Sequence, residues 1–492
     1  MLGAVGGVPV SSPFSIRVTP REHLRTPPPA LFLVMALGAG VAVATWPGAM
    51  NTDALSQIGQ VRSGRYNDWH SGVLVPTWGP LYALGLGAGW VYLGSVVLLV
   101  FGLYELLASA IGRRTAGFVT AGLLAYPPVL GLVVYWGRDQ WFVGALLAAA
   151  ASLVAMAGSG DRHTRATIAF TVSVWAMLAS RQNAPPAAFV LAVAAMVHGG
   201  LGARQSWLTR LGPGRCYGAL GAIALGLAAG AVVAIMLLSQ EAIRRVAGVA
   251  HVHPEQQTLF YDLAAISIDT GDNWFPAVVY AGDVETLAES FSVVDVLPLV
   301  ARPDPVISPL RRGAYSELLR AWAGAVVRQP GPYVQARWNL FMHQLAITGP
   351  AQHVFHDQVD PNEWGYEFLL PDAFSGVASY LQASTPGTSQ DGGPLHAVWG
   401  YVLVTVGGLG WFRSARIERR MLAWVCAATL VNTAGLFFVA PAASYRFTWP
   451  SVVVGCVVVV VWGADLARAA RPPAPGPART KTAAASAGAA VR

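Results

Sequence analysis

Charged residues are scarce in this sequence. Only 12% of its 492 residues are Asp, Glu, Lys or Arg, whereas a soluble domain carries roughly 25%. Hydrophobic residues make up 54% of the chain, and the mean hydropathy is +0.49. This balance excludes an ordinary soluble enzyme and predicts a polytopic α-helical membrane protein.

Cysteine is also scarce. The three cysteines, Cys216, Cys426 and Cys456, lie in or beside apolar runs and show no metal-ligand spacing. The sequence therefore supports neither a disulfide framework nor a cysteine-based zinc site. The net charge of +7 does not indicate a nucleic-acid partner, because the basic residues lie in short loops between apolar runs, where they orient helices.

Long apolar runs, in contrast, are abundant. A straight transmembrane helix needs roughly 20 apolar residues. The sequence predicts about ten spans, several of which are interrupted by Gly and Pro. The runs occupy residues 31–46, 81–110, 116–136, 141–157, 166–180, 184–198, 216–238, 395–412, 421–440 and 447–466.

The loops between the runs indicate the orientation. By the positive-inside rule, the side that receives the arginine-rich loops is cytoplasmic. We therefore expect both termini to be cytoplasmic, and the loop 46–80, the segment after residue 238 and the turn 441–446 to face outward. The arginine-rich segments are the N-terminal tail, 113–114, 161–165, 204–215, 413–420 and the tail after Arg468.

The expected organisation has five parts. The long outer segment should be a mostly helical extracytoplasmic subdomain, in which residues 316–327 and 333–347 are predicted as interfacial amphipathic helices. The Pro- and Ala-rich C-terminus is predicted to be disordered. The parts are a cytoplasmic tail (1–29), a transmembrane module (30–238), the subdomain (239–394), the C-terminal transmembrane helices (395–467) and a cytoplasmic tail (468–492).

The loop 46–80 carries two aspartates, a histidine, two arginines and four aromatics, more than a simple connection needs. Asp53 lies near the expected headgroup plane, where a carboxylate stays ionised and can act as a general base. Alternatively, Asp53 caps a short helix that begins at Ala54. Asp68 and His70 are either a second acid/base pair or anchoring groups, and we favour a structural or substrate-contact role.

Two tight outer turns place further polar groups between apolar runs. Arg138 and Asp139 have almost no loop around them, which costs energy unless they pair or face a wet cavity. One salt-bridged helical turn is the alternative. Arg181 and Asn183 separate two short runs, so Arg181 either meets a buried anion or extends to the surface.

Further guanidinium groups are expected on the same outer side. For Arg337, and for Arg446 after Tyr445, the alternatives are those of Arg181: the guanidinium group meets a buried anion or extends to the surface. Several arginines on one face suit a phosphate, because the guanidinium group binds it with a planar fork. The histidines are scattered along the chain; among them, His353 and His356 with Asp357 offer a metal-binding alternative.

Together these residues resemble a known family. Asn51-Thr52-Asp53, then Gln57 and the run 64–70, resemble the first outer loop of bacterial GT-C-type membrane glycosyltransferases. The Arg-any-Asn turn at Arg181 and the late Tyr445-Arg446 pair are similar to positions in the same group. The group resembles protein O-mannosyltransferases and aminoarabinose or arabinofuranosyl transferases. The likeness covers most of the transmembrane part and little of 239–394.

The resemblance implies an all-α, GT-C-like fold with about ten transmembrane helices. It also implies a reaction at the outer membrane face, in which a sugar leaves a polyprenyl-phosphate carrier. Asp53 would correspond to the acidic residue of the first outer loop, and Asp139 to that of the second. The chain has no Glu beside Asp53 and departs there from the protein O-mannosyltransferases, which leaves the acceptor open.

Residues and resemblance together predict a glycosyltransferase in the cytoplasmic membrane of a high-GC bacterium. The expected partners are a polyprenyl-phosphate-linked sugar donor, a cell-envelope glycan, lipid or protein acceptor, and membrane lipids. The motifs specify no cofactor and leave room for a divalent cation. The alternatives are a transporter or flippase of lipid-linked saccharides and a non-catalytic membrane scaffold. The catalytic candidates are Asp53 and Asp139, and the substrate-binding candidates are Asp68, His70, Arg138, Arg181, Asn183, Arg337, Tyr445 and Arg446.

Overall fold

The computed structural model describes seven stretches of the chain, which together contain α-helices, one short 3₁₀ helix and four isolated β-bridges. The predicted all-α class is confirmed for these residues. Both tails and most of the arginine-rich loops that indicated the orientation lie outside them. The described residues are 29–157, 163–198, 215–301, 305–307, 314–386, 391–412 and 417–470.

The predicted apolar runs all overlap helices of the described residues, although 81–110 and 116–136 are each divided between two helices. Fewer than ten of these helices are long and apolar enough to cross a bilayer. Five helices meet that requirement, and α6 with α7, bent by 75° at Tyr126, would add a sixth. The prediction of ten spans is not confirmed, because α1, α10 and α19 have only 14 to 16 residues. The helices of the bundle are α1 (Pro29–Ala44), α5 (Ala88–Ile111), α6 (Arg113–Ala125), α7 (Pro127–Val133), α8 (Arg138–Met156), α9 (His163–Ser180), α10 (Pro185–His198), α12 (Arg215–Val246), α19 (Val398–Phe412), α20 (Ile417–Val439) and α21 (Tyr445–Ala469).

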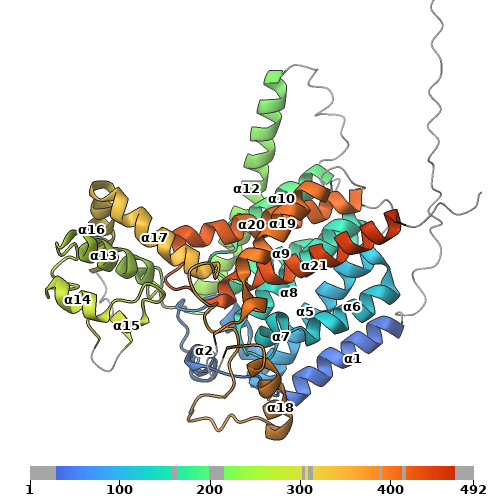
Figure 1. Cartoon of the computed structure of the whole chain (residues 1–492), viewed down its shortest axis with the longest axis horizontal. Helices are drawn as coiled ribbons and strands as arrows, with labels where there is room; N and C mark the ends of the chain where they lie inside the picture. Colours follow the sequence, from blue (N-terminus) through green and yellow to red (C-terminus); the bar gives the residue numbers. More distant parts are fainter. Residues whose placement is uncertain are drawn as a thin grey trace, which may run out of the picture.

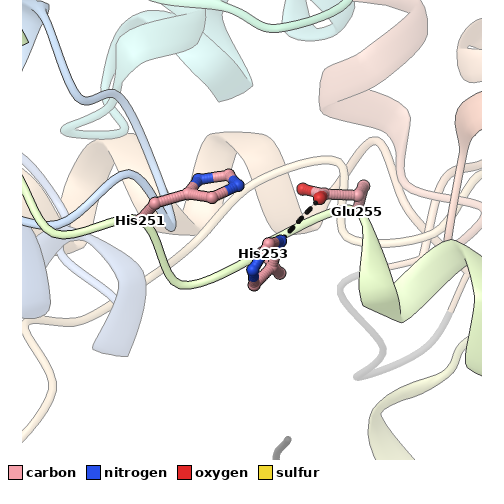
Figure 2. A group of neighbouring side chains, drawn as sticks. All are labelled: His251, His253 and Glu255. Atoms are coloured by element: carbon pink, nitrogen blue, oxygen red, sulfur yellow. Dashed lines mark hydrogen bonds and ion pairs between the residues drawn. The ribbon is translucent and has the colours of Figure 1, made fainter. Parts of the chain in front are cut away.

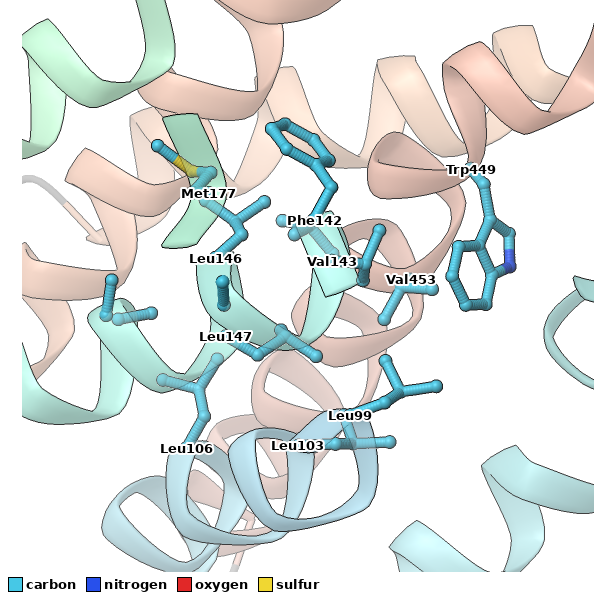
Figure 3. Close-up of a cluster of buried hydrophobic side chains, with 14 of the residues drawn as sticks. Leu99, Leu103, Leu106, Phe142, Val143, Leu146, Leu147, Met177, Trp449 and Val453 are labelled. Carbon is cyan, nitrogen blue, oxygen red and sulfur yellow. The ribbon is translucent and has the colours of Figure 1, made fainter. Parts of the chain in front are cut away.

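Helix α8 lies at the centre of the bundle and packs between α5 and α9. Leucines of α5 meet apolar side chains of α8, with α21 at one side (Figure 3). Two glycines let α5 and α8 approach closely, because a Cβ on Gly102 would lie 2.9 Å from the carbonyl oxygen of Gly144. Small residues at such crossings replace the hydrophobic driving force that lipid does not supply.

The segments that the sequence predicts to lie outside the membrane, called the outer segments, fold against one end of the bundle (Figure 1). A second apolar core joins α13, α16 and α17 to the outer end of α20 through Leu436 and Ala440. The two predicted amphipathic helices correspond to α16 and α17, and α17 also has buried residues. The outer helices are α2 (Thr52–Ser63), α3 (Leu74–Thr77), α4 (Gly79–Ala83), α13 (Gln256–Thr270), α14 (Val284–Ser290), α15 (Leu297–Val300), α16 (Ala314–Arg328), α17 (Pro330–Gln344), α18 (Pro371–Gln382) and η1 (Pro394–His396).

Helix α12 projects from the bundle (Figure 1). Only 17% of its most apolar window is buried, so most of this strongly apolar surface is available to lipid. The helix continues to Val246 before the chain turns into the subdomain. The expected boundary at residue 238 therefore falls within this helix.

Candidate functional site

A cavity of about 940 Å³ lies between the bundle and the outer subdomain. Its wall contains residues from the loop 46–80, from the turns that precede α8 and α10, and from the first turn of α21. Helix α13 and the segments 294–301 and 352–356 complete it. Of the ten candidate residues from the sequence, six line this cavity: Asp53, His70, Arg138, Arg181, Asn183 and Arg446.

Asp53 is placed by helix α2. The N-cap of this helix is Asn51, whose side-chain oxygen accepts a hydrogen bond from the Ala54 amide at 3.1 Å. The alternative role of Asp53 as the cap is therefore wrong, since Asn51 already satisfies that amide. Asp53 lies in the first turn, where the helix dipole favours a negative charge. Its side chain is not needed for capping and lines the cavity.

Asp53 forms an ion pair with Arg446, with 2.9 Å between Oδ2 and the guanidinium nitrogen. Burial alone would raise the pKa of Asp53, but the positive charge of Arg446, followed by the charges of His70 and Arg138, outweighs burial and lowers the pKa to about 2. The carboxylate is therefore ionised at any physiological pH. Both side chains remain partly exposed, at 32% for Asp53 and 26% for Arg446, so a ligand can reach the pair.

Two further arginines face the same space. Arg181 pairs with Asp139, and its Nε donates to the Asn183 side chain at 3.1 Å. Arg138 donates to the backbone carbonyl of His70, and it is the only one of the three cavity arginines that pairs with no carboxylate among the described residues. Arg181 also lies 4.7 Å from the ring centre of Phe447, which provides a flat apolar support.

The charges at this end of the cavity do not cancel. Arg138, Arg181 and Arg446 carry three positive charges, and Asp53 and Asp139 supply two negative ones. His70 adds no positive charge near neutral pH, because burial and the nearby Arg138 lower its pKa to about 3. Among these side chains, one positive charge remains beside Asp53. Asp295, a further wall carboxyl that interacts with Arg446, has its pKa raised by burial, which favours its neutral form. A desolvated guanidinium group of this kind favours an anionic ligand.

Four candidates do not line the cavity. Asp139 is buried against Arg181 and so supports the wall from behind. Arg337 is fully buried in an ion pair with Asp262 at 2.7 Å, which occupies the fork expected to bind a ligand phosphate. Tyr445 is buried, and its hydroxyl donates to the Pro128 carbonyl at 2.8 Å.

Asp68, the fourth, joins two segments of the chain. One of its carboxylate oxygens accepts a hydrogen bond from the Val252 amide at 2.8 Å, and the other contacts Nδ1 of His251. Its side chain is only 7% exposed. The sequence favoured a structural or substrate-contact role for Asp68, and these contacts agree with the structural alternative. His251 is a partner that the sequence did not indicate.

Other wall residues were missed by sequence reasoning. Tyr135 donates its hydroxyl to Asn51 at 2.8 Å and so ties the first outer loop to the residues before α8. Asn51 directly before a helix is a recognisable capping signal, but nothing local indicated Tyr135. His353 and His356, which the sequence offered with Asp357 as metal ligands, also line the cavity, and His356 lies 3.3 Å from Asp360.

The remaining wall is largely apolar. It begins near the outer end of α20 and continues over the subdomain, so the cavity joins a charged end to an apolar end. A ligand that fills it would need a polar head and an apolar body. The principal apolar wall residues are Leu259, Leu319, Trp322, Leu436, Phe438 and Val439.

No protein-family model and no curated protein match the sequence. Two solved structures resemble the chain. One is the archaeal oligosaccharyltransferase AglB from Archaeoglobus fulgidus, in complex with an inhibitory peptide and a dolichol-phosphate. It has a TM-score of 0.35 and 12% identity over 89% of this chain and 51% of AglB. This chain therefore spans about half the length of AglB.

The second structure is ArnT from Cupriavidus metallidurans bound to undecaprenyl phosphate. Its TM-score is 0.31, with 17% identity over 89% of this chain and 78% of ArnT.

Proposed function

We propose that this membrane protein is a glycosyltransferase that takes a sugar from a polyprenyl-phosphate carrier at the outer membrane face. The observation that supports this most strongly is the ionised carboxylate of Asp53, set among three arginines at the polar end of a half-apolar cavity. A phosphate-linked lipid has the matching polarity. In this proposal both termini are cytoplasmic, and the acceptor belongs to the cell envelope.

The donor phosphate is expected to bind Arg138 first, because that guanidinium group has no carboxylate partner among the described residues. The phosphate would then compete with Asp53 for Arg446. As the phosphate takes up part of the positive charge of Arg446, the Asp53 carboxylate becomes more basic and can turn toward an acceptor hydroxyl. Release of a pre-formed ion pair in this way couples donor binding to activation of the base.

The reaction is a single inverting displacement. The acceptor oxygen forms a bond to the anomeric carbon, and the bond from that carbon to the phosphate oxygen breaks. The electron pair leaves with the phosphate, where Arg138 and Arg446 stabilise the charge, and the acceptor proton passes to Asp53. Stabilisation of a developing anion in a site shielded from water is commonly the largest catalytic contribution.

Asp139 has a positioning role in this scheme. Its pair with Arg181 holds that guanidinium group at the wall and, through Asn183, stabilises the turn before α10. Arg337, Tyr445 and Asp68 are structural and are not included in the ligand-binding set.

The test is turnover by purified protein in lipid, with a panel of radiolabelled polyprenyl-phosphate sugars and an extract of envelope acceptors. We expect labelled sugar to leave the carrier in a reaction that the wild type supports and the Arg138→Ala variant loses. If no donor in the panel binds, and carrier release never exceeds that of empty liposomes, the proposed function is wrong.

A further inference from the structure

Outside the charged end of the cavity, three side chains converge in the segment between α12 and α13. They are His251, His253 and Glu255, which alternate along the chain (Figure 2). One potential ligand atom from each lies within 4.8 Å of the others. The imidazole of His251 is turned toward the carboxylate of Glu255 (Figure 2). In the sequence these histidines were grouped with the scattered ones, and only His353 and His356 were offered as metal ligands.

A buried carboxylate fixes His251 in the orientation that a metal ligand needs. Asp68 contacts Nδ1 of His251, which places the ring proton on Nδ1 and leaves Nε2 with a free lone pair. Histidine ligands are commonly held in this way by a carboxylate on the nitrogen away from the metal. Asp68 itself is anchored by the Val252 amide, at 2.8 Å.

Backbone contacts hold the whole segment in place. The Ala250 amide donates to the Tyr66 carbonyl at 2.9 Å, and the Asp68 amide donates to the Ala250 carbonyl at 3.1 Å. This short bridge fastens the residues that follow α12 to the outer loop 46–80. The first histidine is thus presented from a fixed backbone.

The second histidine has an unusual backbone conformation. His253 has a φ of +53°, a region that residues with a side chain rarely adopt. Its ring stacks on Tyr315, with 3.9 Å between the ring centres, and its Nδ1 lies 3.1 Å from Glu255. Such conformations cost energy and are concentrated at functional sites. Here the conformation brings the second imidazole to the carboxylate.

We propose that His251, His253 and Glu255 bind a Zn²⁺ ion, with Asp68 as the positioning residue and a water molecule at the fourth position. Two imidazole nitrogens and one carboxylate form a ligand set that suits Zn²⁺, whereas Mg²⁺ and Ca²⁺ prefer oxygen ligands. Zn²⁺ ligands at about 2.0–2.2 Å from the ion lie closer together than the atoms here. The side chains of His251 and Glu255 are 58% and 43% exposed, so they can close around the ion.

The ion would have a structural consequence for the cavity. Glu255 and the preceding Pro254 belong to the cavity wall. A bound Zn²⁺ would fasten this part of the wall to Asp68 and the loop that carries Asp53. The inference does not rest on the proposed transferase reaction, because zinc binding is measured in the absence of any sugar donor.

Isothermal titration with ZnCl₂ tests the inference on the full-length protein, purified with a histidine-free tag and stripped with a chelator. We expect one tight equivalent in the wild type and a rise in Tm on zinc addition. His251→Ala and His253→Ala should each abolish the tight equivalent. Asp68→Asn should weaken it by about 10- to 100-fold, the usual effect of removing a supporting partner. His343→Ala changes a histidine on α17 outside the cluster and should bind like the wild type.

Folding is checked in the chelator, where each variant should have a Tm close to that of the metal-free wild type. His253→Gln serves as a second, milder variant if the alanine forms are unstable. The inference is overturned if the wild type takes up no stoichiometric zinc, or if the double variant of His251 and His253 retains the same affinity. It is also overturned if excess Mg²⁺ displaces the zinc.

Discussion

The substitution Asp53→Asn tests the assignment of the base most sharply. Asparagine preserves the shape of the side chain but cannot take a proton from the acceptor. General base assistance contributes roughly 10²- to 10⁴-fold. This corresponds to about 3 to 5 kcal/mol in the activation barrier. We therefore expect kcat for sugar transfer to fall by at least a hundredfold.

Donor binding should respond differently. Asp53 holds Arg446 in an ion pair at 2.9 Å, and the amide of asparagine competes for that guanidinium group less strongly. Affinity for polyprenyl phosphate should be unchanged or higher in Asp53→Asn. The pair lowers the pKa of Asp53 from 3.8 to about 2, equivalent to at most about 2 kcal/mol and less for a partly exposed pair. The Tm should therefore fall only modestly.

The same pair gives a pH signature with a defined sign. Asp53 is ionised above a pH of about 2, so kcat/KM of the wild type should show no acid limb from Asp53 between pH 5 and 8. In Arg446→Gln the main counter-charge is lost and burial raises the pKa, so the acid limb should move upward. The stability that the pair contributes also depends on pH. It is complete above pH 3.8 and is lost as the pH falls toward 2.

The matched control is Asp283→Asn, which makes the same chemical change at the N-cap of α14, away from the cavity. Asparagine caps as well as aspartate, so this variant should keep full activity. The assay is release of polyprenyl phosphate by purified protein in liposomes, with binding measured separately. Wild-type turnover in Asp53→Asn would refute the reasoning and leave Asp53 as a partner that only orients Arg446.

Three further outcomes are expected. Arg138→Ala should weaken polyprenyl-phosphate binding by tenfold or more, with partial rescue by lysine, which lacks the planar fork; unchanged affinity would remove Arg138 from the site. Arg337→Ala should cost about 3–5 kcal/mol of stability, because it leaves Asp262 as a buried unpaired charge. Unchanged stability with a loss of donor affinity would show instead that Arg337 binds the ligand. In a protein without its native cysteines, Ser63→Cys should react with a membrane-impermeant reagent from outside intact cells and Arg114→Cys only after permeabilisation, and the opposite result would invert the topology.

The sequence predicted the helices well because apolar periodicity is a local signal. Every predicted apolar run overlaps at least one helix in the described residues. The number of spans was less accessible, because several runs are too short or bent, as at Tyr126 between α6 and α7. Whether such helices cross the bilayer depends on their packing, which no single run encodes.

The candidate site was predicted in part for a different reason. Polar residues in short turns between apolar runs are costly, so Asp53, Arg138, Arg181 and Arg446 were visible one by one. Their partners were not. The pairing of Asp139 with Arg181 and that of Arg337 with Asp262 depend on contacts between distant segments. This is why Arg337 looked like a ligand-binding group in the sequence and is fully occupied in the fold.

The most direct test of the central claim separates covalent transfer from translocation. Purified protein is placed in sealed liposomes with labelled polyprenyl-phosphate sugar and an acceptor on the side of the cavity. We expect the carrier monophosphate and the glycosylated acceptor to appear in equal amounts, at a rate that Asp53→Asn lowers at least a hundredfold. Intact donor that moves between leaflets without cleavage, equally fast in both proteins, would contradict the proposed transfer.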